Sequence, residues 1–264
     1  MSAATHIALV QCDVSDTQSR SERMKSVSAL VQQAAHSGAQ FVVLPELWPL
    51  GAFNVEGMRT ATAHDFQDFL NLGANLARSH GIWLHAGSDI EVASPSGERF
   101  NTSVLFNPRG EIVCTYRKMH LWGGGEAALL GAGAGAQSTA TPIGVAGITT
   151  CYELRFPELY RHLLNDDVTA FIVVAGWPVA RIEHWRTLLR ARAIENQAWV
   201  IGVNCVGTHA GVTMGGFSVV VNPRGEMVVE AAADEPCIVY ADIDATTAVQ
   251  WREKFRWLDD RREY

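Results

Sequence analysis

Buried strands alternate with amphipathic helices along this chain, and the pattern runs twice, which restricts the fold to sheets covered by helices. In the first half we predict strands at 6–10, 41–44, 82–91, 101–107 and 111–119, and helices at 24–34 and 66–77 that end at Gly38 and Gly81. In the second half we predict strands at 142–148, 169–174, 199–206, 213–221, 226–231 and 237–243, and helices from about 157 and at 181–196.

A short repeat within the sequence favours two similar halves. Phe-Asn-Pro-Arg-Gly-Glu-Ile at 106–112 recurs as Val-Asn-Pro-Arg-Gly-Glu-Met at 221–227. Each copy is typical of a tight hairpin, because proline sets φ at the second turn position and glycine takes a left-handed conformation. We therefore predict an α/β fold with layers in the order α-β-β-α and two pseudo-symmetric halves. No linker-like segment separates the halves, so residues 1–264 are expected to form a single domain.

The charge balance excludes functions that need a basic surface. Aspartate and glutamate number 28 against 21 lysines and arginines, which gives a net charge of −7. Because affinity for nucleic acids comes mainly from clustered lysine and arginine, we expect no nucleic-acid partner. No apolar run approaches the ~18 residues that a membrane helix needs, so we expect no membrane partner either.

Five cysteines are scattered through the chain, at positions 12, 114, 151, 205 and 237. They include no Cys-x-x-Cys pair and no His/Cys cluster at zinc spacing, so we predict neither a disulfide framework nor a metal site. The N-terminal residues also lack the basic and apolar segments of a secretory signal. Together these observations favour a reduced, cytoplasmic protein.

Two charged residues lie in apolar surroundings. Glu46 is the only charged side chain within residues 41–53, and burial disfavours the ionised form, as in many general bases. The alternative is a strand-end glutamate turned to solvent. Period-two counting places Lys118 on the same strand face as Cys114 and Tyr116, where a lysine needs a partner. The alternative is a strand-end lysine that reaches water.

Cys151 lies where an apolar strand gives way to a predicted helix. Such a turn exposes the side chain and directs backbone N–H groups and the helix dipole at it, which favours the thiolate. The alternative is a buried structural cysteine, our interpretation of Cys114, Cys205 and Cys237. Glu126 follows three glycines and is either a second acid on a mobile loop or a surface residue.

Three separated motifs together resemble the nitrilase superfamily of carbon–nitrogen hydrolases. They are Leu-Pro-Glu-Leu at 44–47, Tyr-Arg-Lys-Met-His at 116–120 and Cys-Tyr-Glu-Leu-Arg-Phe-Pro-Glu at 151–158. The likeness continues through Gly-Trp-Pro at 176–178 and Ala-Arg-Ala-Ile-Glu-Asn-Gln at 191–197. These stretches are most similar to the omega-amidase and deaminated-glutathione-amidase type, and less similar to aliphatic nitrilases.

The resemblance implies an α-β-β-α sandwich, commonly paired into dimers, and a reaction without a cofactor. Cys151 would be the nucleophile, Glu46 the general base, Lys118 the electrophilic group, and Glu126 the second glutamate that positions substrate and base. The substrate would be a small-molecule amide, hydrolysed through a cysteine thioester to a carboxylic acid and ammonia. Omega-amidases act on monoamides of dicarboxylates or 2-oxo acids.

The expected substrate-binding residues are Tyr152, Arg155 and Trp177. A backbone N–H near Tyr152 would join Lys118 in stabilising the oxyanion. Arg155 would hold a substrate carboxylate through a bidentate pair, or else pair with Glu158 of its own helix. Two positions depart from the close amidases: Gly176 replaces a common asparagine, and Cys205 replaces an arginine that often follows Val-Asn. The loop at 122–135 is expected to cover the pocket mouth.

Several alternatives remain open. Within amidases, the enzyme is either omega-amidase-like or a broader aliphatic amidase or N-carbamoyl hydrolase. A papain-like hydrolase would instead pair Cys151 with a histidine, with candidates His120, His184 and His209. A non-catalytic binding protein on the same fold is the alternative outside the enzymes. A homodimer is expected through the helix near 157–165 and the C-terminal segment, where an aromatic cluster seals the interface or packs on its own subunit: Trp251, Phe255 and Trp257.

Overall fold

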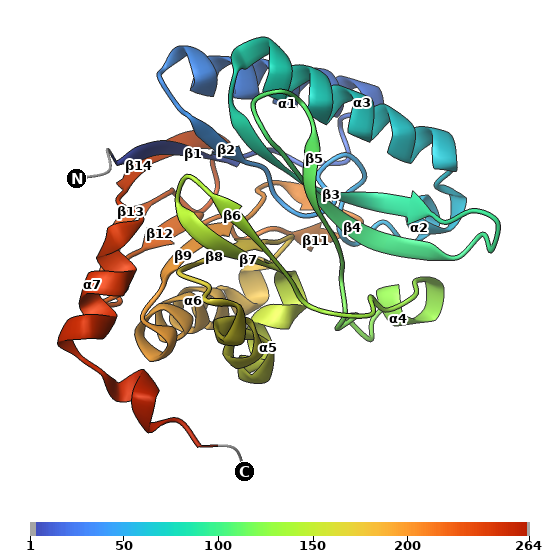
Figure 1. The fold of residues 1–264 in the computed structure, drawn as a ribbon. Helices are drawn as coiled ribbons and strands as arrows, with labels where there is room; N and C mark the ends of the chain where they lie inside the picture. Colours follow the sequence, from blue (N-terminus) through green and yellow to red (C-terminus); the bar gives the residue numbers. More distant parts are fainter. Residues whose placement is uncertain (1–3, 263–264) are drawn as a thin grey trace.

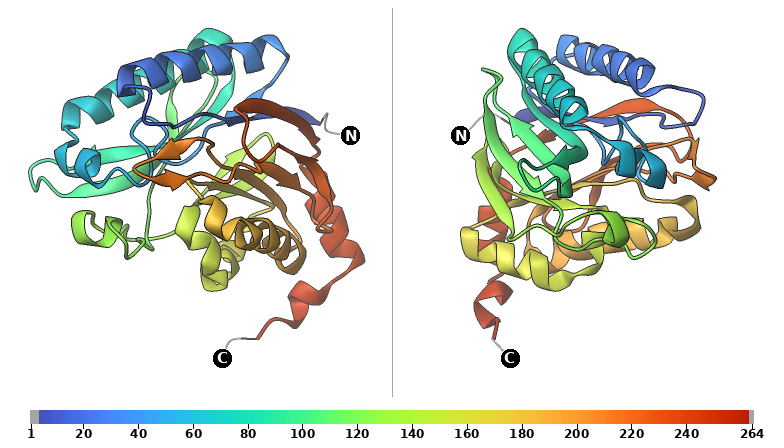
Figure 2. Two further views of the ribbon diagram at one scale, coloured as in Figure 1. Left: turned by 180° about the vertical axis from the view of Figure 1, so that it is seen from behind. Right: turned by 90° about the vertical axis from the view of Figure 1, so that its right-hand side faces the viewer.

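Two six-stranded sheets lie face to face at the centre of the molecule, and helices cover their outer faces (Figure 1). This arrangement comes from a computed structural model that describes residues 4–262. Both views of Figure 2 place α1 and α3 on one outer side and α5 and α6 on the other. The predicted α-β-β-α sandwich is therefore confirmed.

Each sheet has three parallel strands at its centre and antiparallel strands at its edges. The first sheet runs β14 (Cys237–Ile243), β1 (Thr5–Gln11), β2 (Phe41–Val43), β3 (Trp83–Val92), β4 (Arg99–Phe106) and β5 (Ile112–Arg117). The second runs β13 (Met227–Glu230), β12 (Val219–Val221), β9 (Trp199–Val203), β8 (Ala170–Val174), β7 (Gly144–Thr150) and β6 (Gln137–Thr141). The two halves thus share one strand pattern.

The repeated Asn-Pro-Arg-Gly segments occupy equivalent places in the two halves. The first joins β4 to β5 and the second joins β12 to β13, each with a register shift beside the turn. Gly110 and Gly225 have φ of 73° and 81°, a left-handed conformation that glycine adopts at little cost. The internal repeat therefore marks a structural repeat.

The helices on each outer face begin and end where local signals direct them. On the first sheet, α1 (Arg20–His36) and α3 (Ala63–His80) both start with a capping box, in which a side chain and the backbone satisfy each other's free groups. On the second sheet, α5 (Pro157–Leu163) starts with proline, and α6 (Ile182–Asn196) ends at Gln197 in a left-handed conformation. The shorter helices are α2 (Val55–Thr60), α4 (Glu126–Leu129) and α7 (Thr246–Lys254).

Three apolar clusters hold these layers together. One lies between the sheets and includes Ile7, Phe41, Ile172 and Ile201, all fully buried. The second packs α1 and α3 on the first sheet, and the third packs α5 and α6 on the second. No helix within residues 4–262 is long and apolar enough to span a membrane.

The secondary structure differs from the prediction in several places. The expected strand at 213–221 is interrupted, because Gly216 and Phe217 adopt positive φ between the short β11 (Val212–Thr213, paired with β10 at Thr208–His209) and β12. The strand expected at 142–148 starts at Gly144, and β6 before it was not foreseen. The helix α7 was also missed, because its mean hydropathy is low and its only buried residue is Ala248.

Candidate active site

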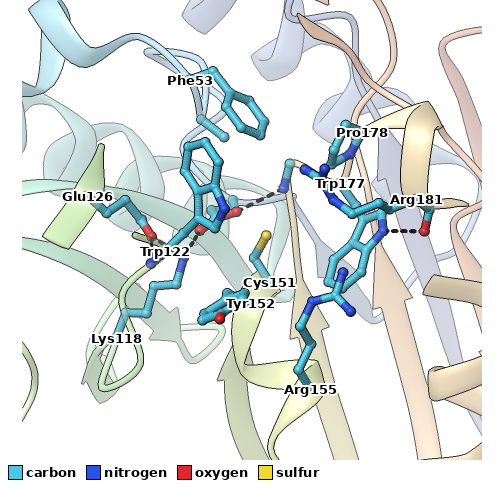
Figure 3. A pocket seen from close by; sticks show the side chains of 13 residues that line it. Phe53, Lys118, Trp122, Glu126, Cys151, Tyr152, Arg155, Trp177, Pro178 and Arg181 are labelled. Carbon is cyan, nitrogen blue, oxygen red and sulfur yellow. Dashed lines mark hydrogen bonds and ion pairs between the residues drawn. The ribbon is translucent and has the colours of Figure 1, made fainter. Parts of the chain in front are cut away.

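The predicted site residues line one open cavity, with about 460 Å³ of empty space when its open mouth is included (Figure 3). It opens between loops that leave both sheets, so neither half of the sandwich forms it alone. The residues that line it are Glu46, Ala52, Phe53, Lys118, Trp122, Glu126, Cys151, Tyr152, Arg155, Gly176, Trp177, Pro178 and Arg181. In Figure 3, Cys151 lies between Lys118 and Glu126 on one side and Arg155 and Trp177 on the other.

Glu46 follows β2 and is 1% exposed, so it does not point to solvent. Its Oε1 accepts hydrogen bonds from Lys118 Nζ at 2.8 Å and Asn101 Nδ2 at 2.9 Å. Its Oε2 accepts one from the backbone N–H of Gly176 at 2.9 Å. A Cβ at position 176 would lie 2.4 Å from the Cβ of Ala52, so a side chain there requires this wall to move. Glu46 is therefore held from both sheets.

Lys118 lies directly after β5 and is 1% exposed. Its Nζ donates to Glu46 Oε1 and also to Glu126 Oε2, at 2.7 Å. Burial opposes its charge, but the carboxylates of Glu126 and Glu46 outweigh burial and hold the pKa of Lys118 well above its usual value. Lys118 is thus a protonated ammonium between two acids.

Glu126 begins α4 and is 3% exposed, so the glycine-rich loop folds it inward. Its oxygens accept hydrogen bonds from Lys118, from Asn101 Nδ2 at 2.9 Å and from the backbone N–H of Trp122 at 2.9 Å. Burial alone would raise the pKa of Glu126, but Lys118 outweighs burial and lowers it. Glu126 is therefore an ionised carboxylate.

Cys151 starts the turn that follows β7, with a φ of 50° that non-glycine residues rarely adopt. Burial and the nearby carboxylate of Glu46 raise the pKa of its thiol well above the usual value, and Lys118 offsets only part of that shift. The turn was expected to favour the thiolate, but burial and Glu46 favour the neutral thiol instead. The turn is a short 3₁₀ helix (Cys151–Arg155), and its dipole does not compensate for desolvation.

Two residues that the sequence analysis did not single out hold the site together. Asn101 on β4 donates to both Glu46 and Glu126. Glu153 is fully buried and accepts hydrogen bonds from Tyr116 Oη and from the backbone N–H groups of Met119, His120 and Thr150. It therefore ties the segment that carries Lys118 to the turn that carries Cys151. The sequence feature that could have pointed to Glu153 is its position inside the motif that begins at Cys151.

Arg155 and Trp177 lie together at the wall of the cavity, where Tyr152 also lies. The Arg155 guanidinium stacks 4.7 Å from the centre of the Trp177 ring, and its Nη1 donates to His184 Nδ1 at 3.2 Å. Among the described residues, no carboxylate lies within 4.0 Å of Arg155, so the alternative pairing with Glu158 is absent. Arg181, which sequence reasoning missed, also lines the cavity, and its backbone oxygen accepts a hydrogen bond from Trp177 Nε1 at 2.8 Å.

The three candidate histidines lie elsewhere. His120 stacks on Phe156, with ring centres 4.1 Å apart, and His209 lies beside Asp16. No histidine is among the residues that line the cavity. Among the described residues that line the cavity, Cys151 therefore has glutamate and lysine neighbours and no histidine. A papain-like site would pair the cysteine with a histidine.

Cys205, the other departure from the close amidases, lies behind the cavity. It is 1% exposed, and its Sγ is 4.0 Å from the backbone oxygen of Glu46 and 3.7 Å from that of Ala175.

Within residues 4–262, no group of three or more His, Cys, Asp or Glu side chains is arranged to hold a metal ion.

Comparisons with known proteins agree with this geometry. The carbon-nitrogen hydrolase family model matches residues 6–253. The chain is 35% identical to the 2-oxoglutaramate amidase of Paenarthrobacter nicotinovorans, over 97% of this chain and 89% of that protein. It is 32% identical to the deaminated glutathione amidase of Mus musculus, over 95% of this chain and 82% of the relative. The crystal structure of Saccharomyces cerevisiae Nit3, of the nitrilase superfamily, superimposes with a TM-score of 0.88 at 26% identity, covering 99% and 97% of the two chains.

The chain therefore belongs to the carbon–nitrogen hydrolase family of the nitrilase superfamily. It is an amidase-type hydrolase that acts on carbon–nitrogen bonds other than peptide bonds.

Proposed function

We propose that this protein hydrolyses a small carboxamide through a thioester on Cys151, with Glu46 as general base and Lys118 as electrophile. The observation that carries the proposal is the buried Glu46–Lys118–Glu126 network in the cavity that contains the Cys151 sulfur. A thiol with a raised pKa is a poor nucleophile by itself, so it needs a base within reach.

The reaction uses Glu46 twice. The Glu46 carboxylate takes the Cys151 proton while sulfur bonds to the amide carbon, and the carbonyl oxygen becomes an oxyanion. Glu46 then gives that proton to the amide nitrogen, the carbon–nitrogen bond breaks, and ammonia leaves. Glu46 next takes a proton from water, the resulting hydroxide adds to the thioester carbon, and the carbon–sulfur bond breaks. Glu46 then returns that proton to the departing thiolate, which gives the carboxylic acid, the free thiol and the Glu46 carboxylate again.

Lys118 stabilises the oxyanion in both steps, with a backbone N–H near Tyr152 as the second donor. The ammonium is already charged and fixed between two carboxylates, so little reorganisation is needed when negative charge develops. Glu126 does not touch the reacting carbon in this scheme. Its role is to keep Lys118 protonated and in place.

We further propose that the preferred substrates carry a carboxylate as well as the amide, as in omega-amidases. Relatives named 2-oxoglutaramate amidase support this substrate class. The Arg155 guanidinium supports it independently, because it faces the cavity without a carboxylate partner among the described residues, and bidentate pairing with a carboxylate would satisfy it. Trp177 keeps the guanidinium in place by stacking.

Ammonia release from five compounds tests the proposal. They are alpha-ketoglutaramate, succinamate, a neutral aliphatic amide, an N-carbamoyl amino acid and an aliphatic nitrile, each measured beside Cys151→Ala. Activity confined to the two carboxylated amides is expected. Preference for the neutral amide would make the enzyme a broader aliphatic amidase with a structural Arg155, and preference for the carbamoyl compound would make it an N-carbamoyl hydrolase. Activity that survives in Cys151→Ala would contradict the mechanism.

We also propose that the chain forms one domain, works as a homodimer and is cytoplasmic. The dimer is supported by exposed apolar side chains on the C-terminal segment, where Phe255 and Trp257 are 40% and 41% exposed beside Trp251. The compartment is supported by the five free thiols. A monomeric mass at micromolar concentration would contradict the dimer.

A further inference from the structure

Arg23 on α1 is a buried arginine that the proposed reaction does not use. It is 2% exposed, and burial lowers its pKa. Among the described residues no carboxylate lies within 4.0 Å of it, although a buried cation is costly unless hydrogen bonds satisfy it. Arg23 therefore needs another set of acceptors.

Backbone oxygens from two loops supply those acceptors. Nη1 donates to Pro49 at 3.0 Å and to Trp48 at 3.4 Å. Nη2 donates to Val14 at 3.3 Å, Ser15 at 3.0 Å and Gln18 at 3.2 Å. One guanidinium thus joins the loop after β1 to the loop that follows Glu46. Because the guanidinium is planar and its donors are fixed in direction, it holds the two loops in one geometry.

The loop that Arg23 holds carries Glu46 at its start and a cavity wall at its end. Trp48 lies two residues after Glu46, and the loop returns to the cavity at Ala52. Leu47 and Gly51 have φ of 43° and 94°, so the loop departs from regular structure at both ends. An irregular loop of this kind keeps its shape only through contacts with its surroundings.

Apart from Arg23, neutral hydrogen bonds and apolar packing hold the loop after Glu46 on the side away from the cavity. Cys205 lies against the Glu46 backbone oxygen, but a thiol is a weak donor and burial raises its pKa, which keeps it neutral. Two neutral hydrogen bonds also join the loop to β3: Leu47 N donates to Ser88 Oγ at 3.0 Å, and Trp48 Nε1 donates to Ala86 O at 2.8 Å. The Leu47 and Trp48 side chains are buried in apolar clusters. Arg23 is the charged donor on this side.

We propose that Arg23 is a positioning residue for Glu46: by holding the Trp48 and Pro49 backbone oxygens, it fixes the loop so that Glu46 faces the Cys151 sulfur. This inference rests on the proposed role of Glu46 as general base. Arg23 does not line the cavity, so its effect is on the chemical steps and not on substrate binding.

The test compares Arg23→Met with Arg252→Met, a matched control. Arg252 also donates to three backbone oxygens, those of Val168, Asn196 and Gln197, but it lies on α7. We expect both variants to lose thermal stability. Arg23→Met should also lose about 100-fold in kcat with KM within about twofold, because a displacement of about 1 Å at a reacting group has that effect. Arg252→Met should keep its kcat.

Arg23→Lys provides a second variant if the methionine variant folds poorly. It keeps the charge but has one donor nitrogen instead of a planar fork, so we expect an intermediate loss of kcat. Guanidinium at low millimolar concentration should restore part of the kcat of Arg23→Ala and have no effect on Arg252→Ala. An unchanged kcat in folded Arg23→Met, or an equal loss in Arg252→Met, would overturn the positioning role.

A crystal structure of Arg23→Met separates this inference from the proposed function. The expected change is a shift of residues 47–50 and a longer separation between Glu46 Oε2 and Gly176 N than the present 2.9 Å. An unmoved loop would overturn the role of Arg23 whatever the enzyme hydrolyses. If the wild-type protein releases no ammonia from any of the five compounds, the proposed function is overturned. The positioning role of Arg23 is then still tested by whether the loop shifts in the Arg23→Met structure.

Discussion

The ends of β1 and β7 are equivalent places in the two halves, and a cysteine follows each strand. Both strands pair with an antiparallel neighbour on one side and a parallel strand on the other. After β1, Cys12 is 1% exposed and continues in an extended path, its backbone oxygen accepting from Val206 N–H at 3.0 Å. After β7, Cys151 turns sharply into the cavity.

The difference shows that the turn after the strand decides whether a cysteine at this place faces the cavity. Residue type and strand position are the same at both sites, and both thiols lie against buried strands. Only at Cys151 does a positive φ move the sulfur off the sheet and toward a carboxylate and an ammonium. We therefore expect substitutions at the two cysteines to have opposite effects on activity and stability.

The largest effect should come from the two cysteines themselves. Cys151→Ser is expected to lower kcat by about 10⁴-fold or more, because removal of a nucleophile abolishes the covalent route. Cys12→Ser should keep most of the activity. Ammonia release by both purified variants is the measurement. Comparable losses of kcat in the two variants would mean that both cysteines contribute to the chemistry, and would contradict the assignment of the nucleophile to Cys151 alone.

Lys118→Met should have the next largest effect. Loss of one oxyanion donor lowers kcat by about 100- to 1,000-fold. The variant also leaves Glu46 and Glu126 close together without a cation between them, so one of these acids should take up a proton. Lys25→Met, at an exposed position on α1, is the control and should be silent. Steady-state kinetics on the best amide measure both, and a fully active Lys118→Met would remove lysine from the mechanism.

Arg155→Gln should separate substrates by charge. Loss of a charged hydrogen-bonding partner should lower kcat/KM about 10- to 100-fold on carboxylated amides. Neutral amides should be affected little. Arg190→Gln, which removes a guanidinium outside the cavity, is the matched control. An equal loss on neutral and carboxylated amides would indicate that Arg155 supports the fold and does not bind the substrate.

Alkylation by iodoacetamide should distinguish the two cysteines by pH. Burial and Glu46 raise the pKa of Cys151, so its thiol remains protonated at pH values where an ordinary thiol ionises. The rate at Cys151 should therefore keep rising above pH 9, by up to about tenfold per pH unit, because the thiolate is the reactive form. Peptide mass spectrometry assigns the site, and the buried Cys12 should stay unmodified. A plateau below pH 8 would show that the resting form is a thiolate.

The smallest effect should be on stability. Here the substitution of Cys12 should have the larger effect, whereas the substitution of Cys151 has the larger effect on activity. Cys12→Ala removes a fully packed sulfur and should cost about 1 kcal/mol in the free energy of unfolding. Cys151→Ala should cost less, because its sulfur faces a cavity. Urea denaturation of both variants gives the comparison. A larger loss in Cys151→Ala would mean that the strained turn depends on the sulfur for its packing.

The sequence allowed the layers to be predicted, as well as the residues that the structure brings to one cavity, but not the contacts that hold them. Glu46, Lys118 and Cys151 stand in apolar segments, so local pattern was enough to single them out. Asn101 lies in an ordinary strand, and its two carboxylate partners are 55 and 25 residues away. No local spacing encodes such a contact. The expected effect of the turn on the Cys151 pKa was overturned for the same reason, because Glu46 and burial act on the thiol from distant segments.

By itself the sequence determined the alternation of strands and helices, the repeated hairpin and the family motifs. Those features depend on spacing within one element, which the side-chain periods of strands and helices set. Only the tertiary structure decided which acids share Lys118, that Cys151 rather than Cys12 faces a cavity, and that Arg23 holds the Glu46 loop. These depend on how two sheets pack and on which charges burial brings together, and desolvation and Coulomb forces then set their ionisation.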